Sequence, residues 1–209
     1  MLRALLRGTR LLFEFLKTVL LIIKFPHSTF QSIATKRNFI NLLFIWIVIF
    51  FSLVWTEGIR HGVFRHPMFF AVNFMTFFLA TVFSFILVSS LMFYLGKFFG
   101  GRGDIGTIFL LWGFSYLPTV CWFLVVSFLF VLFPPPRSFS IPGYTLSAVL
   151  IAISIGLFYW KLLLYYLTLR IGFRFTWGPI IKVSLILFPI VTIYSIFMYK
   201  AGIFKVPFI

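Results

Sequence analysis

The sequence predicts an all-α integral membrane protein, a bundle of five transmembrane helices preceded by an amphipathic helix at the membrane surface. Of its 209 residues, 62% are hydrophobic and 10% are charged, whereas soluble domains carry about 25% charged residues. The mean hydropathy is +1.14. The 18 lysines and arginines stand mainly at the ends of long hydrophobic runs, where basic side chains anchor helices at lipid headgroups. The net charge of +15 therefore predicts contact with anionic lipid and argues against a nucleic-acid partner.

Residues 1–37 form the predicted surface region. Charged residues there recur at spacings of four and three, on one narrow helical stripe: Arg3, Arg7, Arg10, Glu14 and Lys17. Because leucine and phenylalanine fill the other faces, this helix is expected to lie in the interface with its basic stripe toward the headgroups. Pro26 ends the helix and opens a second, short one that reaches Arg37. A signal peptide is the alternative, but Glu14 and Lys17 interrupt its hydrophobic region and no small-residue cleavage site follows.

Residues 38–209 form the predicted five-helix domain. Its spans are predicted at residues 39–55, 68–95, 105–133, 144–169 and 179–199. Pro118 cannot donate a hydrogen bond to the carbonyl of Phe114, so the third span is expected to kink there. Consecutive prolines at 134–136 predict a stiff break before the fourth span. Cys121, within the third span, is expected to be a small core residue.

A glycine-dense basic turn separates the second span from the third. Its glycines are Gly96, Gly100, Gly101, Gly103 and Gly106. Gly100 or Gly101 can adopt the left-handed conformation that ends a helix, and consecutive backbone N–H groups can form a shallow anion-binding nest. A tight polar turn and an anion site are thus the two interpretations. The predicted surface for lipid headgroups or a partner includes this turn and comprises Arg3, Arg7, Arg10, Lys97, Gly100, Gly101, Arg102, Arg170 and Arg174.

Small residues at a spacing of four predict two places of close helix packing. Gly96 stands four residues before Gly100 at the end of the second span. The fourth span carries Ala148, Ala152 and Gly156. Because such residues let helix backbones approach closely, we expect a neighbouring helix at each place.

The distribution of basic residues predicts the orientation in the membrane. Five spans place the termini on opposite sides, and 13 of the 18 basic residues then fall on the side of the N-terminus. Basic residues accumulate on the cytoplasmic side of a membrane. We therefore expect a cytoplasmic N-terminus and a C-terminus on the opposite side.

The glycine turn and the helix after it resemble a known family. Leu95–Lys97, Gly100–Gly103 and Gly113–Pro118, with the layout of five apolar runs, resemble the Yip1 family of five-span membrane proteins. Phe25–Phe30 and Tyr159–Lys161 are similar to its shorter bacterial and archaeal members. The resemblance begins at residue 25 and extends through the fifth span. It implies an accessory protein of a prokaryotic cell membrane, in some relatives beside ABC-type export systems.

The sequence also departs from part of that family. Eukaryotic members carry an acidic, aromatic N-terminal region that ends in a DLxGP-like motif, and they are implicated in Rab GTPase binding and vesicle traffic. Neither feature is present here, and the family's Gly-Tyr step in the third span is Gly113-Phe114. The resemblance therefore implies the membrane fold but not Rab binding.

The chain offers few groups for catalysis. It has three carboxylates, three histidines and one cysteine. Glu57 and His61 stand one helical turn apart and His66 follows, which makes these three the nearest approach to a metal site. Metal sites usually show tighter ligand spacing, so we interpret the three as interfacial loop residues. We expect no enzyme activity, no metal and no cofactor.

Two functions follow from these features. The preferred one is a non-enzymatic scaffold or accessory protein that binds membrane proteins, including copies of itself, or organises the bilayer, beside a transport or trafficking system. The alternative is a transporter or lipid-moving protein with a polar cavity lined by Asn73, Ser115, Tyr116 and Lys161. Coupled carriers usually place ionisable groups within their spans, and here only Lys161 and Lys182 lie in apolar stretches. Both can equally be anchors that extend to the inner interface.

Overall fold

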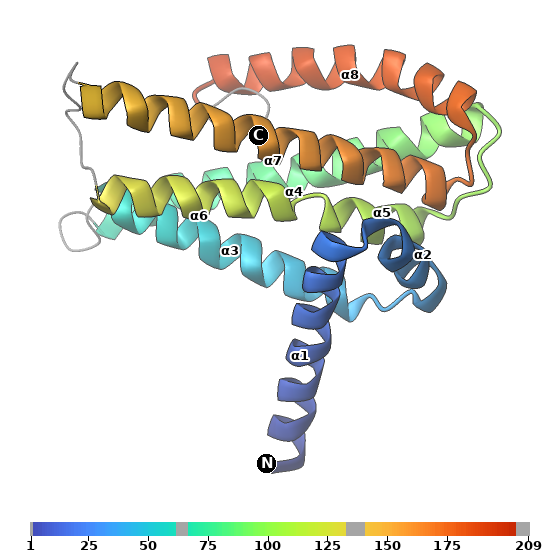
Figure 1. Cartoon of the computed structure of the whole chain (residues 1–209), viewed down its shortest axis with the longest axis horizontal. Helices are drawn as coiled ribbons and strands as arrows, with labels where there is room; N and C mark the ends of the chain where they lie inside the picture. Colours follow the sequence, from blue (N-terminus) through green and yellow to red (C-terminus); the bar gives the residue numbers. More distant parts are fainter. Residues whose placement is uncertain (1, 62–66, 133–140, 204–209) are drawn as a thin grey trace.

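Every secondary-structure element in the described part of the chain is an α-helix. The structure, a computed structural model, describes residues 2–61, 67–132 and 141–203 (Figure 1). It describes their side chains except those of residues 2–7, 57, 60–61, 67–74, 130 and 141–142. In chain order the helices are α1 Leu2–Lys24, α2 Pro26–Lys36, α3 Ile40–His61, α4 Pro67–Phe98, α5 Ile105–Phe114, α6 Leu117–Leu132, α7 Ile141–Gly172 and α8 Trp177–Lys200.

Four segments in the described ranges are long and apolar enough to cross a membrane. They are Met75–Phe98, Ile105–Leu129, Gly143–Gly172 and Trp177–Lys200. The helix α3 adds a shorter apolar stretch, Ile40–Thr56. These segments confirm the predicted all-α membrane bundle, and α3 as a fifth span stays a prediction. The predicted break at prolines 134–136 lies outside the described residues.

Helices α3 to α8 run along the long axis of the molecule, and α1 crosses that axis (Figure 1). One cluster of buried side chains joins α1 and α2 to the bundle, and Phe15 of α1 stacks there on Phe44 and Phe114. A second cluster joins α4, α5, α7 and α8 around Met92 and Val183. Since α5 and α7 contribute buried residues to both clusters, these two helices connect the surface region with the rest of the bundle.

The expected kink at Pro118 is a break between two helices. The helix α5 ends at Phe114, and α6 starts at Leu117 with Pro118 in its first turn. Ser115 Oγ donates to Trp112 O at 2.6 Å, and Tyr116 N donates to Gly113 O at 3.1 Å. Because Pro118 has no N–H and cannot continue the bonding of α5, these two bonds close the last turn instead.

The glycine turn surrounds the ring of Phe173, which follows α7. Gly100 adopts φ +82° and ends α4. Phe173 is 1% exposed, and a Cβ on Gly96 would overlap its ring. A Cβ on Gly101 would lie 2.6 Å from the ring and 2.7 Å from Gly96 O. The turn is therefore a socket for Phe173, and the Arg102 N–H donates to Phe173 O at 3.2 Å.

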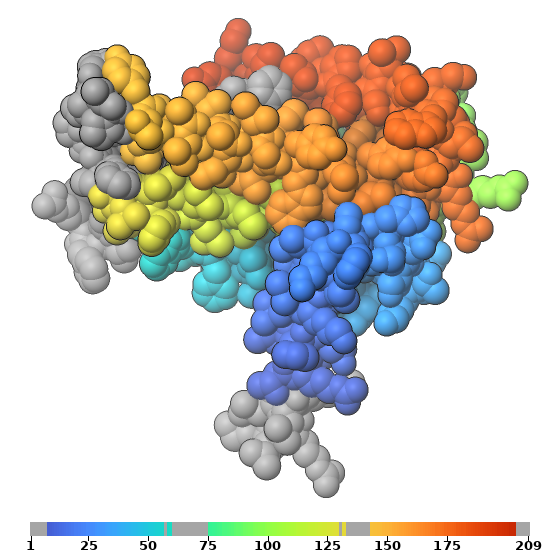
Figure 2. All heavy atoms as spheres, viewed as in Figure 1, coloured from blue at the N-terminus to red at the C-terminus, as the bar shows by residue number. Residues whose placement is uncertain are grey.

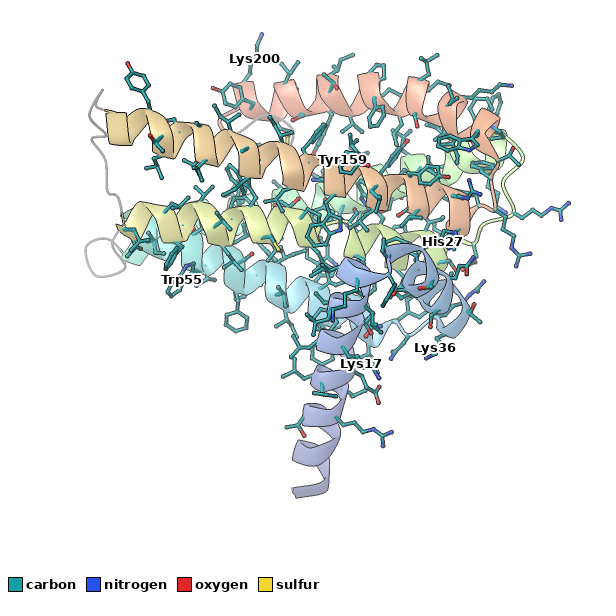
Figure 3. All side chains as sticks on the ribbon, viewed as in Figure 1. Lys17, His27, Lys36, Trp55, Tyr159 and Lys200 are labelled. Atoms are coloured by element: carbon teal, nitrogen blue, oxygen red, sulfur yellow. The ribbon has the colours of Figure 1, made fainter. Side chains whose placement is uncertain are left out.

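The segments around this socket lie at one end of the bundle, and α1 and α2 pack on the same half of it, with α1 nearer the middle of the long axis (Figure 1). We call this region, which comprises α1, α2, residues 99–104 and residues 173–176, the basic end. Arg37, after α2, reaches this turn, because its Nη1 lies 3.4 Å from Asp104 Oδ2. In Figure 3, His27 and Lys36 lie toward the basic end, whereas Trp55 and Lys200 lie toward the other.

Candidate functional site

The helix α1 has three faces with different surroundings. Phe15 and Ile22 are buried against the bundle. On the exposed surface, apolar side chains occupy one face: Leu12, Phe13, Leu16, Leu20 and Ile23. Arg10, Glu14 and Lys17 occupy another, where Arg10 Nε lies 3.2 Å from Glu14 Oε1. The helix α1 stands out from the bundle in Figure 2. Its apolar face suits contact with lipid, and its charged face suits contact with water.

A polar cleft of about 570 Å³ lies between α1 and α2. Its lining side chains are Glu14, Lys17, Thr18, Leu21, Phe25, Ser28, Thr29, Ser32, Ile33, Lys36, Asn38 and Asn41. None of these residues belongs to the predicted headgroup surface. They come from three helices and their connections, so no periodic pattern in the sequence marks them as neighbours.

The basic side chains at the socket differ in their contacts. Lys97, Arg102 and Arg174 are exposed, and Lys97 Nζ lies 5.6 Å from the centre of the Phe93 ring. Arg170 is half-buried and donates from Nη1 to the Tyr166 hydroxyl. The Arg3 and Arg7 side chains lie outside the described ones.

Backbone donors of the glycine turn are already engaged within the chain. Gly100 N donates to Lys97 O at 3.0 Å, and Gly101 N donates to Gly96 O at 2.8 Å. The Arg102 N–H is engaged with the connector after α7. The predicted surface therefore depends on the exposed side chains of Lys97, Arg102 and Arg174 rather than on the amides of Gly100 and Gly101.

The two predicted packing sites have different neighbours. Gly96 is buried against Phe173 of the connector. Ala148, Ala152 and Gly156 are exposed on α7, and no other helix of the described chain comes within 4 Å of where a Cβ on Gly156 would be. This face of α7 is therefore uncovered in the described structure.

Two residues of the predicted polar cavity line an observed one. Tyr116 and Lys161 line a cavity of about 530 Å³ between α4, α5, α7 and α8, which we call the Lys161 cavity. Its other lining residues are Ser84, Val88, Trp112, Phe158, Leu162, Tyr165, Leu187, Phe188, Val191, Thr192, Tyr194 and Ser195. Ser115 is buried in the α5–α6 break, and the Asn73 side chain lies outside the described ones.

Lys161 is held inside the bundle by α6 and the break before it. Its Nζ donates to Thr119 Oγ1 at 3.0 Å and lies 5.6 Å from the centre of the Tyr116 ring. Lys161 also lines a second cavity of about 220 Å³ with Trp122 and Ser154. Lys182, in contrast, is exposed on α8, as an interfacial anchor would be.

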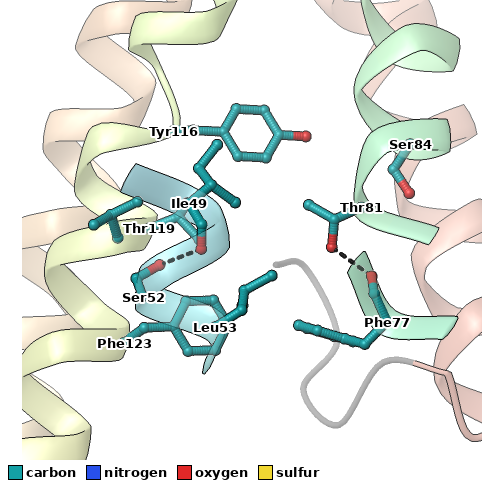
Figure 4. Close-up of a pocket in the computed structure, with 10 residues that line it drawn as sticks. Ile49, Ser52, Leu53, Phe77, Thr81, Ser84, Tyr116, Thr119 and Phe123 are labelled. Carbon is teal, nitrogen blue, oxygen red and sulfur yellow. Dashed lines mark hydrogen bonds between the residues drawn. The ribbon is translucent and has the colours of Figure 1, made fainter. Parts of the chain in front are cut away.

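A smaller cavity lies on the other side of Tyr116 (Figure 4). It measures about 30 Å³, room for one water molecule. Two hydroxyl groups on its wall donate to carbonyls of their own helices. Ser52 bonds to Ile49 O and Thr81 bonds to Phe77 O, each at 2.8 Å. This cavity is therefore too small for a lipid or a solute larger than water.

Among the side chains that the structure describes, no three His, Cys, Asp or Glu residues gather as metal ligands. The side chains of Glu57, His61 and His66 lie outside that set. The described sites are thus a basic end with an amphipathic helix and a cavity lined by one half-buried lysine.

This arrangement defines an integral membrane protein built as an all-α bundle. The model of the Yip1 domain matches residues 20–199, and the chain belongs to this family. The predicted family is thereby confirmed. No curated protein and no solved structure matches the chain.

Proposed function

We propose that this protein is a non-enzymatic membrane scaffold that organises the bilayer from its basic end. The three-faced helix α1 carries this proposal. Because the spanning helices follow the membrane normal, a helix that crosses their axis lies along the membrane surface (Figure 1). Its exposed apolar face then enters one leaflet, and the basic side chains beside it attract anionic headgroups.

A helix placed in one leaflet expands that leaflet relative to the other and favours curvature. The burial of Phe15 and Ile22 fixes α1 to the bundle, so its orientation does not depend on lipid binding. We propose that the basic end faces the cytoplasm of a prokaryotic cell, in agreement with the bias of basic residues toward this end.

Vesicles test this proposal. The purified chain is reconstituted into phosphatidylcholine vesicles with and without phosphatidylglycerol, and vesicle diameter is measured by electron cryomicroscopy. We expect smaller or tubular vesicles with the wild-type chain, most strongly with the anionic lipid. Leu16→Glu with Leu20→Glu removes the effect because two charges then occupy the lipid face of α1.

The matched control places two glutamates on the exposed side of α2, as Gln31→Glu with Thr35→Glu. It adds the same charge near the same end and is expected to leave vesicle shape as in the wild type. The same vesicle diameter and shape with both double variants would contradict the proposal.

A second candidate function, association with a further copy of the chain, is favoured by the uncovered face of α7. Ala148, Ala152 and Gly156 leave room there for a close helix approach. In a Cys121→Ser background, Ala152→Cys is expected to form disulfide-linked dimers in membranes, and Ile151→Cys, exposed on another side of α7, is not. The same yield of disulfide-linked dimers from both variants would contradict association through this face of α7.

A further inference from the structure

Lys161 carries a charge that the described chain does not neutralise. The two carboxylates whose side chains are described, Glu14 and Asp104, pair with Arg10 and Arg37. An ammonium has three N–H donors, and the Thr119 hydroxyl is the one hydrogen-bond acceptor that the described residues give it. Since an ionised group among membrane helices is costly without a partner, an anion would stabilise this site.

The Lys161 cavity has the size and lining of a small-molecule site. Its volume, about 530 Å³, falls in the range of about 300–1,000 Å³ that such sites occupy. Aliphatic and aromatic side chains, those of leucine, valine, phenylalanine, tyrosine and tryptophan, supply most of its wall. The indole N–H of Trp112, another wall residue, is buried and has no acceptor in the described chain.

Three hydroxyl groups of the wall, those of Ser84, Tyr165 and Tyr194, are hydrogen-bonded to other hydroxyl groups of the chain. The hydroxyls of Ser84 and Tyr194 lie 2.8 Å apart, and those of Tyr165 and Ser184 lie 2.9 Å apart. Lys161 is the one charged residue among those that line the cavity. The wall thus combines one cation with a large apolar surface.

The cavity reaches the outside of the bundle between α7 and α8. Phe158 and Phe188 line it and are also 57% and 43% exposed. Tyr159 on α7 and Lys17 on α1 lie at a similar level along the bundle in Figure 3. Lys161, about 3 Å further along α7, is therefore near the level of the polar face of α1, where headgroups are expected.

We propose that the Lys161 cavity binds an acyl-chain amphiphile with an anionic headgroup. The headgroup accepts hydrogen bonds from Lys161 Nζ, and the chain lies among Val88, Leu162, Leu187 and Val191. A carboxylate and a phosphate share this chemistry. The proposal is independent of the scaffold function, because it uses neither α1 nor vesicle shape.

Photocrosslinking tests the site in the full chain. The protein in phosphatidylcholine nanodiscs is irradiated with a diazirine-bearing oleate, and modified residues are mapped by mass spectrometry. Competition with unlabelled oleate, oleoyl lysophosphatidate and neutral monooleoylglycerol identifies the headgroup. We expect crosslinks on the parts of α7 and α8 that line the cavity, and displacement by either anion but not by the neutral compound.

Two matched lysine variants test the role of the charge. Lys161→Met is expected to weaken oleate binding about 10- to 100-fold, as for loss of a hydrogen bond to a charged group. Lys182→Met, which removes the same charge from the exposed surface of α8, leaves binding unchanged. Lys161→Arg retains binding within a few-fold.

Three results would overturn the proposal. They are equal competition by monooleoylglycerol, equal loss in the two methionine variants, and crosslinks spread over the outer surface of the bundle. If Lys161→Met fails to fold, the crosslink positions and the competition in the wild-type chain decide the question without it.

Discussion

Phe173 explains at the residue scale why the turn after α4 is rich in glycine. Its buried ring fills the space that side chains on Gly96, Gly101 and Gly103 would need. Gly101 and Gly103 are the most constrained, because an added Cβ would meet a backbone oxygen, that of Gly96 or Gly172 respectively, which cannot move aside as a flexible side chain can. The socket joins the α4–α5 turn to the α7–α8 connector.

Gly101→Ala is therefore expected to lower the free energy of unfolding by about 1–3 kcal/mol, the usual cost of overpacking. The melting temperature in mild detergent measures it. Gly178→Ala is the control, because among the described residues nothing outside its own stretch of helix lies within 4 Å of its added Cβ, and alanine favours the helix there. A melting temperature for Gly101→Ala at or above that of the wild type would contradict the socket.

The glycines of the socket could be predicted from residues close in sequence, but Phe173 could not. The density of glycines identified the end of α4, and Gly100 indeed has the left-handed conformation that was one of the two expectations. Phe173 stands about 70 residues later, and no local pattern couples it to the turn. The same limit applies to Thr119 on α6, which lies in an apolar run and accepts a hydrogen bond from Lys161 on α7.

At the scale of elements, Asp104 connects α2 with α5. Its Oδ2 accepts from Thr107 N at 3.3 Å as the N-cap of α5 and also lies beside Arg37, which ends α2. Helix periods predicted α1, α2 and the spanning helices, because apolar faces and prolines are local signals. The uncovered face of α7 could not be foreseen, since the spacing of small residues does not say which helix covers them.

Asp104→Ala is expected to lower the free energy of unfolding by about 1 kcal/mol, as for other lost N-caps. Asp104→Asn keeps the cap and loses only the exposed ion pair with Arg37, worth about 0–1 kcal/mol. Thermal unfolding in detergent is therefore expected to order the variants as wild type, asparagine, then alanine. An asparagine variant as unstable as the alanine variant would show that the ion pair, not the cap, is what stabilises this connection.

At the scale of the whole molecule, all the described connections at the basic end lie on one side of the bundle. If α3 is a fifth span, the residues after α8 lie on the other side of the membrane. Charge bias, which is a property of the whole chain, predicts the same orientation, and this orientation stays a prediction. Of the residues that line the Lys161 cavity, the sequence analysis named only Tyr116 and Lys161, because the others are apolar, aromatic or hydroxyl side chains that give no signal in a hydrophobic chain.

Cysteine accessibility tests the orientation. In a Cys121→Ser background, Arg102→Cys is expected to react with a membrane-impermeant maleimide only after cells are opened. Ala201→Cys, after α8, is expected to react in intact cells. Labelling of both positions from the same side would exclude five spans.

The depth of α1 in the bilayer tests the scaffold account most directly. Single cysteines at Leu12, Leu16, Leu20, Arg10 and Lys17 in the Cys121→Ser background are spin-labelled, and accessibility to oxygen and to a water-soluble nickel chelate is measured in vesicles. We expect the three leucine positions to be in contact with acyl chains and the two basic positions to be in water, which gives a helical period along α1. Uniform access to the nickel chelate along α1 would place this helix in water and contradict the account.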